Sequence, residues 1–281
     1  METDGGRTPK RDGALPRRKA AVCLLLLAFA LAACAREAPV GPAPLGLARD
    51  GHVPPFARRP YQPFSREAVV QIALREWRAF GQKIVYPDTE LPFEDERIEG
   101  LWQRVGEYWW LGLPMGEAEQ ALTGRHDENG VVFAPEEDGR FAWSAAFVSY
   151  VMRIAGAGTR FPYSGTHADY INAARLNPSG FVVAAEPPPS YAPRRGDLIC
   201  LWRGRPLRFE DLTAGRFASH CDIVVATRPG QLEVVGGNVD NTVALRSIPV
   251  APDGRLVGPD GRVVDPDHPW FVVLRVDDGA G

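Results

Sequence analysis

The hydrophobic pattern of this chain changes its period once, at Pro187-Pro188-Pro189. Before these prolines, apolar residues recur every three or four positions, which predicts helices over residues 65–80, 96–110 and 142–155 and a short helix from residue 167. After them, apolar runs bounded by turn residues predict strands over residues 197–202, 220–226, 231–236, 242–248 and 270–276. Helices followed by consecutive strands are typical of an α+β domain with an antiparallel sheet.

The first 33 residues have the pattern of an export signal. Arg17-Arg18-Lys19 precedes an apolar run over residues 20–33, which is shorter than the ~20 residues that a membrane-spanning helix needs. The run ends in Leu31-Ala32-Ala33-Cys34, which resembles the lipobox of bacterial lipoproteins. We therefore expect a signal peptide over residues 1–33 and a lipid on Cys34 that anchors the protein to a membrane. An ordinary signal peptide with a Cys by chance is the alternative.

The residues after Cys34 predict a tether and a location. By resemblance to lipoprotein sorting in Gram-negative bacteria, Ala35 in place of Asp favours the outer membrane, with the protein in the cell envelope facing the periplasm. Residues 34–62 are rich in Pro, Ala, Gly and Arg and have no apolar period, which predicts a flexible tether. One folded domain is expected over residues 63–281.

The composition excludes some classes of partner. The 281 residues carry a formal net charge of −3, and no basic cluster follows the leader, which argues against a nucleic-acid partner. The spacing of His and Cys residues supplies no set of three or four zinc ligands. We expect a monomer without a metal or a cofactor.

Three residues have the types and positions that amide hydrolysis requires: a nucleophile, a base and a group that orients the base. Ser144 lies in the first turn of its predicted helix, where free backbone N–H groups favour negative charge. His220 begins a predicted strand and shares one face with Asp222, whereas Cys221 points to the other face. Asn238 follows Gly236-Gly237, which let the backbone approach closely. The predicted catalytic residues are therefore Ser144, His220 and Asn238.

The order of these motifs resembles that of CHAP and NlpC-type peptidoglycan hydrolases, which have a papain-like fold. The motifs are Trp143-Ser144-Ala145-Ala146-Phe147, Gly196-Asp197-Leu198-Ile199, His220 with Ile223-Val224-Val225, and Val235-Gly236-Gly237-Asn238. The chain is more closely similar to a bacterial family of unknown function, DUF2272, over about residues 65–276, a likeness that includes the segment Phe161-Pro-Tyr-Ser-Gly-Thr-His167. For papain-like relatives the resemblance implies Cys–His–polar triads that act on peptidoglycan peptides.

Two departures from the CHAP pattern leave several functions open. Ser144 replaces the Cys nucleophile, and Gly236 stands where many CHAP domains have a Glu. A Ser hydroxyl is far less acidic than a thiol and depends on a strongly oriented base. Asp222 is the substitute carboxylate, but its nearness to His220 in sequence predicts a poor position. The hypotheses are a serine amidase or peptidase, a pseudoenzyme that binds cell-wall peptide or an envelope partner, an effector or immunity-type partner, and a purely structural role for these residues.

Further residues are assigned to the cleft and to a disulfide. We expect Trp143, Tyr163, His167 and Asp222 to bind substrate, with a catalytic role for His167 as an alternative. In an oxidising compartment Cys200 and Cys221 form an even pair. If their strands pair as the family resemblance implies, a disulfide forms. Two buried free thiols, or Cys200 or Cys221 as the true nucleophile, are the alternatives.

Overall fold

A computed structural model describes residues 51–58, 61–86, 89–212 and 215–279. The predicted signal peptide and the lipidation site Cys34 lie outside these described residues. In the described part of the chain, none of the helices is both long enough and apolar enough to cross a bilayer.

Helices fill most of the first two thirds of the described chain. The α-helices are α2 (Pro55–Arg58), α3 (Arg66–Ala79), α4 (Leu101–Gly112), α5 (Ser144–Ile154) and α6 (His167–Leu176). Short 3-10 helices are η2 (Asp95–Arg97), η3 (Ala118–Ala121), η4 (Pro135–Phe141), η5 (Gly158–Arg160) and η6 (Phe209–Asp211). This distribution agrees with the helical periodicity before the three prolines.

Local sequence sets the ends of these helices. The Ser65 side chain accepts a hydrogen bond from the Ala68 N–H and caps α3, and Gly81, with φ of 80°, follows its end. The second predicted helix begins later than expected, because Gly100 has φ of 88° and interrupts the chain between η2 and α4.

The packed structure begins before the predicted boundary at residue 63. Residues 55–58 form α2, and Val53 and Ala57 are buried. The His52 ring contacts the Trp110 ring of α4 edge to face, with centroids 5.6 Å apart. The C-terminal part of the predicted tether therefore packs against the folded domain.

Seven strands form one mixed sheet in the order β1-β6-β5-β4-β3-β7-β2. They are β1 (Lys83–Val85), β2 (Val183–Glu186), β3 (Leu198–Trp202), β4 (Ser219–Arg228), β5 (Gln231–Val239), β6 (Thr242–Pro249) and β7 (Trp270–Val276). The α+β class is as predicted. The expectation of a purely antiparallel sheet is wrong, because β1 pairs with β6 in parallel. The periodicity also missed β1 and β2, which are only three and four residues long.

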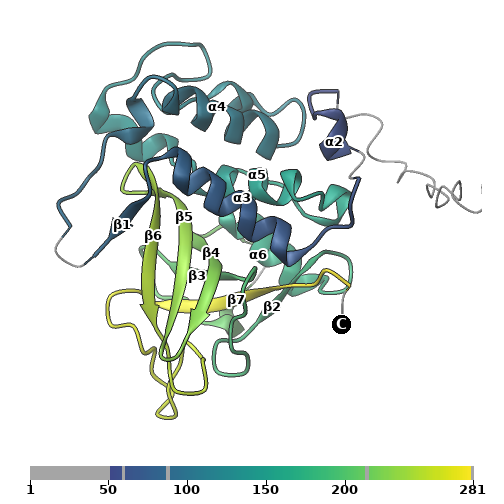
Figure 1. Ribbon diagram of the computed structural model, residues 1–281, viewed down its shortest axis with the longest axis vertical. Helices are drawn as coiled ribbons and strands as arrows, with labels where there is room; N and C mark the ends of the chain where they lie inside the picture. Colours follow the sequence, from purple (N-terminus) through teal and green to yellow (C-terminus); the bar gives the residue numbers. More distant parts are fainter. Residues whose placement is uncertain (1–50, 59–60, 87–88, 213–214, 280–281) are drawn as a thin grey trace, which may run out of the picture. The chain divides into compact units, whose positions relative to one another are not determined.

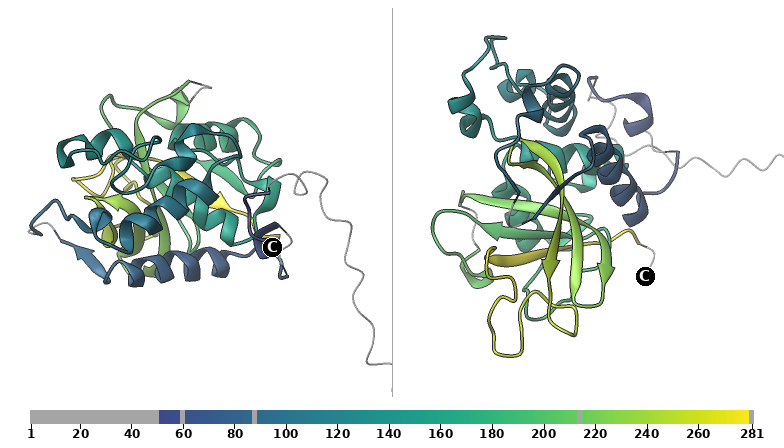
Figure 2. Two further views of the ribbon diagram at one scale, coloured as in Figure 1. Left: turned by 90° about the horizontal axis from the view of Figure 1, so that it is seen from above. Right: turned by 60° about the vertical axis from the view of Figure 1, so that its left-hand side comes forward.

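Side chains cover both faces of the sheet. On one face, residues of α3, α4 and α5 share a core with β3, β4 and β5, and Figure 1 shows these helices gathered on one side of the strands. On the other face, the segment between β6 and β7 packs Val250 and Leu256 against Val224 and Val234. Figure 2 shows the same arrangement from two further directions. Burial on both faces explains why the strands read as nearly continuous apolar runs.

A disulfide joins the two central strands. Cys200 of β3 and Cys221 of β4 are directly opposite each other in the register, and their sulfur atoms are bonded. Both residues are fully buried in the core shared with the helices. The link fixes the start of β4, where His220 and Asp222 point to the opposite face.

We predict that replacing both Cys200 and Cys221 by Ala lowers the free energy of unfolding by about 2–4 kcal/mol, because a crosslink over 21 residues restricts the unfolded chain. Urea unfolding with and without reductant measures this. Reductant should destabilise the wild type and leave the double variant unchanged. The prediction would be contradicted if reductant left the free energy of unfolding of the wild type unchanged.

Candidate active site

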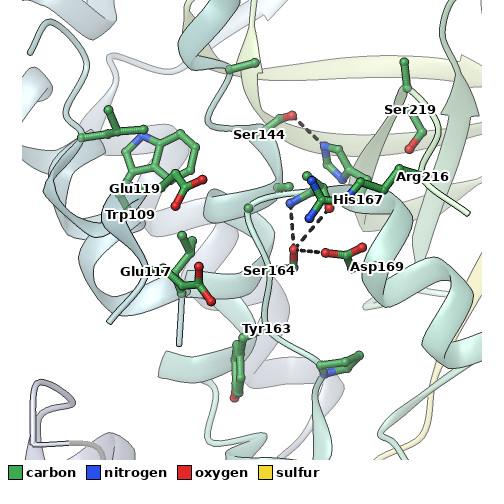
Figure 3. Close-up of a pocket in the computed structure, with 18 of the residues that line it drawn as sticks. Trp109, Glu117, Glu119, Ser144, Tyr163, Ser164, His167, Asp169, Arg216 and Ser219 are labelled. Atoms are coloured by element: carbon green, nitrogen blue, oxygen red, sulfur yellow. Dashed lines mark hydrogen bonds between the residues drawn. The ribbon is translucent and has the colours of Figure 1, made fainter. Parts of the chain in front are cut away.

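Ser144 is the first residue of α5 and forms a short hydrogen bond with a histidine. Its Oγ lies 2.6 Å from Nε2 of His167, the first residue of α6 (Figure 3). Both residues are more than nine-tenths buried, yet both line a cavity. The beginnings of two helices therefore bring a hydroxyl and an imidazole together at the surface of a cavity.

The other ring nitrogen of His167 contacts a phenol. Nδ1 of His167 is hydrogen-bonded to the hydroxyl of Tyr170, one helical turn further along α6. Burial, with smaller contributions from His220 and Arg203, holds the pKa of His167 well below its usual value. At neutral pH the imidazole is therefore uncharged, and one of its nitrogens is free of a proton.

His220, the base expected from the sequence, has a different partner from the one predicted. Its Nε2 lies 2.9 Å from Oδ1 of Asp222, and no hydrogen bond joins it to Ser144 or to Asn238 among the described residues. Its ring is adjacent to that of His167, with centroids 5.5 Å apart. The expected pairing of Ser144 with His220 is thus replaced by a pairing with His167, and His220 lies beside that pair.

Asp222 is well placed to hold His220, contrary to the expectation from its closeness in sequence. Residues two apart on a strand share a face, so the carboxylate reaches the ring directly. Burial opposes the charge of Asp222, but Arg246 and His220 together outweigh it and keep its pKa below the usual value. Because the carboxylate is ionised, it accepts the proton of Nε2. Nδ1 of His220 is then left as a bare acceptor, and it has no hydrogen-bond partner in the described structure.

Gly236 makes the contact between Asp222 and Arg246 possible. Arg246 lies on β6 and Asp222 on β4, so their ion pair crosses the intervening strand β5. A Cβ atom on Gly236 would lie 2.0 Å from Oδ1 of Asp222. Position 236 therefore carries no side chain, and the carboxylate of Asp222 occupies the adjoining space.

The Gly-Gly-Asn motif serves packing more than the orientation of His220. A Cβ atom on Gly237 would lie 2.4 Å from the ring of Phe147, so this glycine lets α5 approach β5. Asn238 has φ of 52°, a left-handed conformation that Asn tolerates better than most residues. Within the described structure Asn238 makes no side-chain hydrogen bond to His220.

Two of the predicted substrate-binding residues do not reach the cavity. Trp143 is 1% exposed, and its indole N–H donates to Oε2 of Glu96. Asp222 is fully buried beside His220, and neither it nor Trp143 lines the cavity. Tyr163 and His167, in contrast, both line the cavity.

The cavity has a volume of about 590 Å³ and opens beside Ser144. Its apolar lining includes Trp109, Leu113 and Tyr163. Its polar and charged lining includes Glu117, Glu119, Arg140, Ser164, Asp169, Arg203, Arg216 and Ser219. Figure 3 shows Glu117 and Glu119 on the side opposite Arg216. The described residues contain no cluster of three or more His, Cys, Asp or Glu side chains suited to a metal ion.

Comparison with known proteins identifies a family. The model of a family described as an uncharacterized protein conserved in bacteria, DUF2272, matches residues 96–276. The match covers more than half of the chain, so the chain belongs to this family and the predicted membership is confirmed. No curated protein and no solved structure matches the chain.

We predict that Gly236→Ala destabilises the protein by about 1–3 kcal/mol, because the added methyl group overlaps Asp222 and forces the ion pair with Arg246 apart. Urea unfolding measures the change. Gly139→Ala is the matched control, since a Cβ atom there meets nothing within 4 Å. Equal stability of the two variants would contradict the account of Gly236.

A second prediction concerns Glu96, which accepts the Trp143 indole N–H. Burial raises the pKa of Glu96 to about 8, against which the bond from Trp143 acts only in part. Because the folded state holds this proton more tightly than the unfolded state, stability should fall as the pH rises from about 4.5 to about 8. Between pH 5 and pH 8.5 the free energy of unfolding should therefore fall by roughly 2–4 kcal/mol less in Glu96→Gln than in the wild type. Denaturant unfolding at these two pH values measures the difference. A parallel pH dependence of both proteins would refute this.

Proposed function

We propose that this member of the DUF2272 family is a serine hydrolase of amide bonds, with Ser144 as the nucleophile and His167 as the general base. The observation that carries the proposal is the 2.6 Å hydrogen bond between Ser144 and His167 at the surface of a cavity. A nucleophile and a base within hydrogen-bond reach are the first geometric requirement for acyl transfer.

The reaction would follow the usual course of acyl transfer. Oγ of Ser144 attacks the amide carbonyl carbon while Nε2 of His167 takes the hydroxyl proton. The imidazolium then gives that proton to the leaving amine, and the C–N bond breaks. Water, deprotonated by the same nitrogen, hydrolyses the acyl-enzyme and restores Ser144. Free backbone N–H groups at the start of α5 suit the developing oxyanion.

The surroundings of His167 favour this role in two ways. Its lowered pKa keeps it unprotonated at neutral pH, so it is ready to accept a proton. The negative charge of Asp222 acts in the opposite direction and stabilises the imidazolium once it forms. His220 thus becomes a positioning residue, which holds Asp222 beside the His167–Ser144 pair.

The substrate class and location are also part of the proposal. We infer peptidoglycan peptides as substrates, with the protein held in the cell envelope by a lipid on Cys34. The disulfide between Cys200 and Cys221 supports an oxidising compartment outside the cytoplasm. The lipobox-like segment and the resemblance to CHAP hydrolases support the same location and substrate.

A binding function is the second candidate, and one observation favours it. The group behind His167 is the neutral phenol of Tyr170 instead of a carboxylate, so the imidazolium lacks the direct ion pair that serine proteases have. In this reading the cavity retains a peptide without cleaving it.

We predict that the purified protein releases products from isolated sacculi, and that Ser144→Ala and His167→Gln each lower the rate by about 10²–10⁴-fold. His220→Gln should lower it less, because His220 acts only through Asp222. The acid limb of kcat/KM should lie below pH 6.5, following the lowered pKa of His167. Release of soluble fragments, followed by chromatography and mass spectrometry, measures the rate.

The other outcomes decide between the alternatives. Activity confined to Ser144→Cys would support a cavity that only binds peptide. A larger loss in His220→Gln than in His167→Gln would restore His220 as the base, as the sequence predicts. Equal rates for the wild type and Ser144→Ala would refute the serine hydrolase.

A further inference from the structure

Two arginines without acidic partners line the cavity on one side. Arg203 follows β3 and Arg216 precedes β4, and both side chains are exposed. The backbone N–H of Arg203 donates to the carbonyl of Ala218 at 2.8 Å, which holds the two segments side by side. Neither guanidinium forms an ion pair with a carboxylate in the described structure. Arg140, a third arginine of the lining, is neutralised by Glu137.

Two glutamates without basic partners line the opposite side. Glu117 and Glu119 lie in the segment after α4, and neither forms an ion pair within the described residues. Gln120 fixes this segment, because its side chain accepts from the Gly116 N–H and donates to the Trp110 carbonyl. These two hydrogen bonds fix the backbone that carries Glu117 and Glu119 in the cavity wall.

The reactive pair lies between these charges. Figure 3 shows Ser144 between the side that carries Glu117 and Glu119 and the side that carries Arg216. Trp109 adds an apolar surface on the acidic side. On the arginine side the lining also has the carboxylate of Asp169, which accepts a hydrogen bond from the Ser164 hydroxyl. A ligand that reaches Ser144 therefore meets two arginines in one direction and two glutamates in the other.

We propose that the cavity binds a short peptide with charges of both signs, its carboxylate paired with Arg203 and Arg216 and its ammonium group with Glu117 and Glu119. The inference rests on the proposed function in one respect, namely that the amide bond of the bound peptide lies next to Ser144. Exposed ion pairs contribute little singly. Two like charges on each side of the cavity together fix the direction of the ligand and select against peptides that lack either group.

The test measures binding to full-length Ser144→Ala, which cannot cleave its ligand. The probes are tetra-alanine with both termini free, its N-acetyl form, its C-terminal amide and the doubly blocked peptide, titrated by calorimetry. The free peptide should bind tightest, and blocking either terminus should weaken binding roughly tenfold.

Added substitutions assign each charge. With Arg203→Gln and Arg216→Gln together, the amide should bind as well as the free acid, while the preference for a free amine persists. With Glu117→Gln and Glu119→Gln together, the preference for the free amine should disappear and the preference for the acid persist. Arg262→Gln is the matched control, because Arg262 is exposed and does not line the cavity. It should leave both preferences unchanged.

Other outcomes overturn the inference without touching the proposed function. Equal affinity for all four peptides, no binding of any of them, or preferences that survive the paired arginine and paired glutamate substitutions would each refute a cavity selective for both charges. If the wild type still releases products from sacculi through Ser144, the hydrolase stands. If it releases none while the peptides bind as predicted, the selective cavity stands and the hydrolase fails.

Discussion

The rest of the site depends on the interactions of one buried carboxylate, that of Asp222. A fully buried charge is costly unless it is paired, and here Arg246 from β6 and His220 from β4 both contact it. The pairing requires β5 to have no side chain at Gly236, since even a methyl group would overlap the carboxylate. Three neighbouring strands are thus fixed in register around one negative charge.

This charge accounts for the different states of the two imidazoles. His220 donates its Nε2 proton to Asp222 and is fixed in one tautomer, whereas the hydrogen bonds of the His167 ring are both to hydroxyl groups. His167 is therefore the imidazole that is free to exchange a proton with Ser144. The disulfide on the reverse face of β4 holds the strand in the position that this division requires.

Much of the fold follows from periodicity, and the site follows in part. The long helices and the central strands have strong periods and clear caps, such as Ser65 and Gly81, so their positions were predictable. The strands β1 and β2 are too short to show a period, and β1 forms only by pairing in parallel with a distant strand. Ser144, His167, His220 and Asp222 were all named from the sequence as candidate site residues, and the structure places them near one another.

The pairing within the site was not predictable, because it depends on contacts between elements. Nothing in the sequence shows that His167 of α6, and not His220 of β4, forms the hydrogen bond with Ser144. The bare Gly236 was interpretable only as a missing Glu, whereas its neighbours show that it makes room for Asp222. A signal was present in retrospect, since Tyr170 lies one turn after His167 and suits a partner for its second nitrogen.

Covalent labelling is the most direct test of the central claim, that Ser144 is a nucleophile activated by His167. The wild type is incubated with a fluorophosphonate and examined by intact-mass and peptide mass spectrometry. The account predicts one adduct, located on Ser144, that forms much more slowly in His167→Gln at pH 7. No adduct on the folded wild type, or an equal rate of labelling without His167, would contradict it.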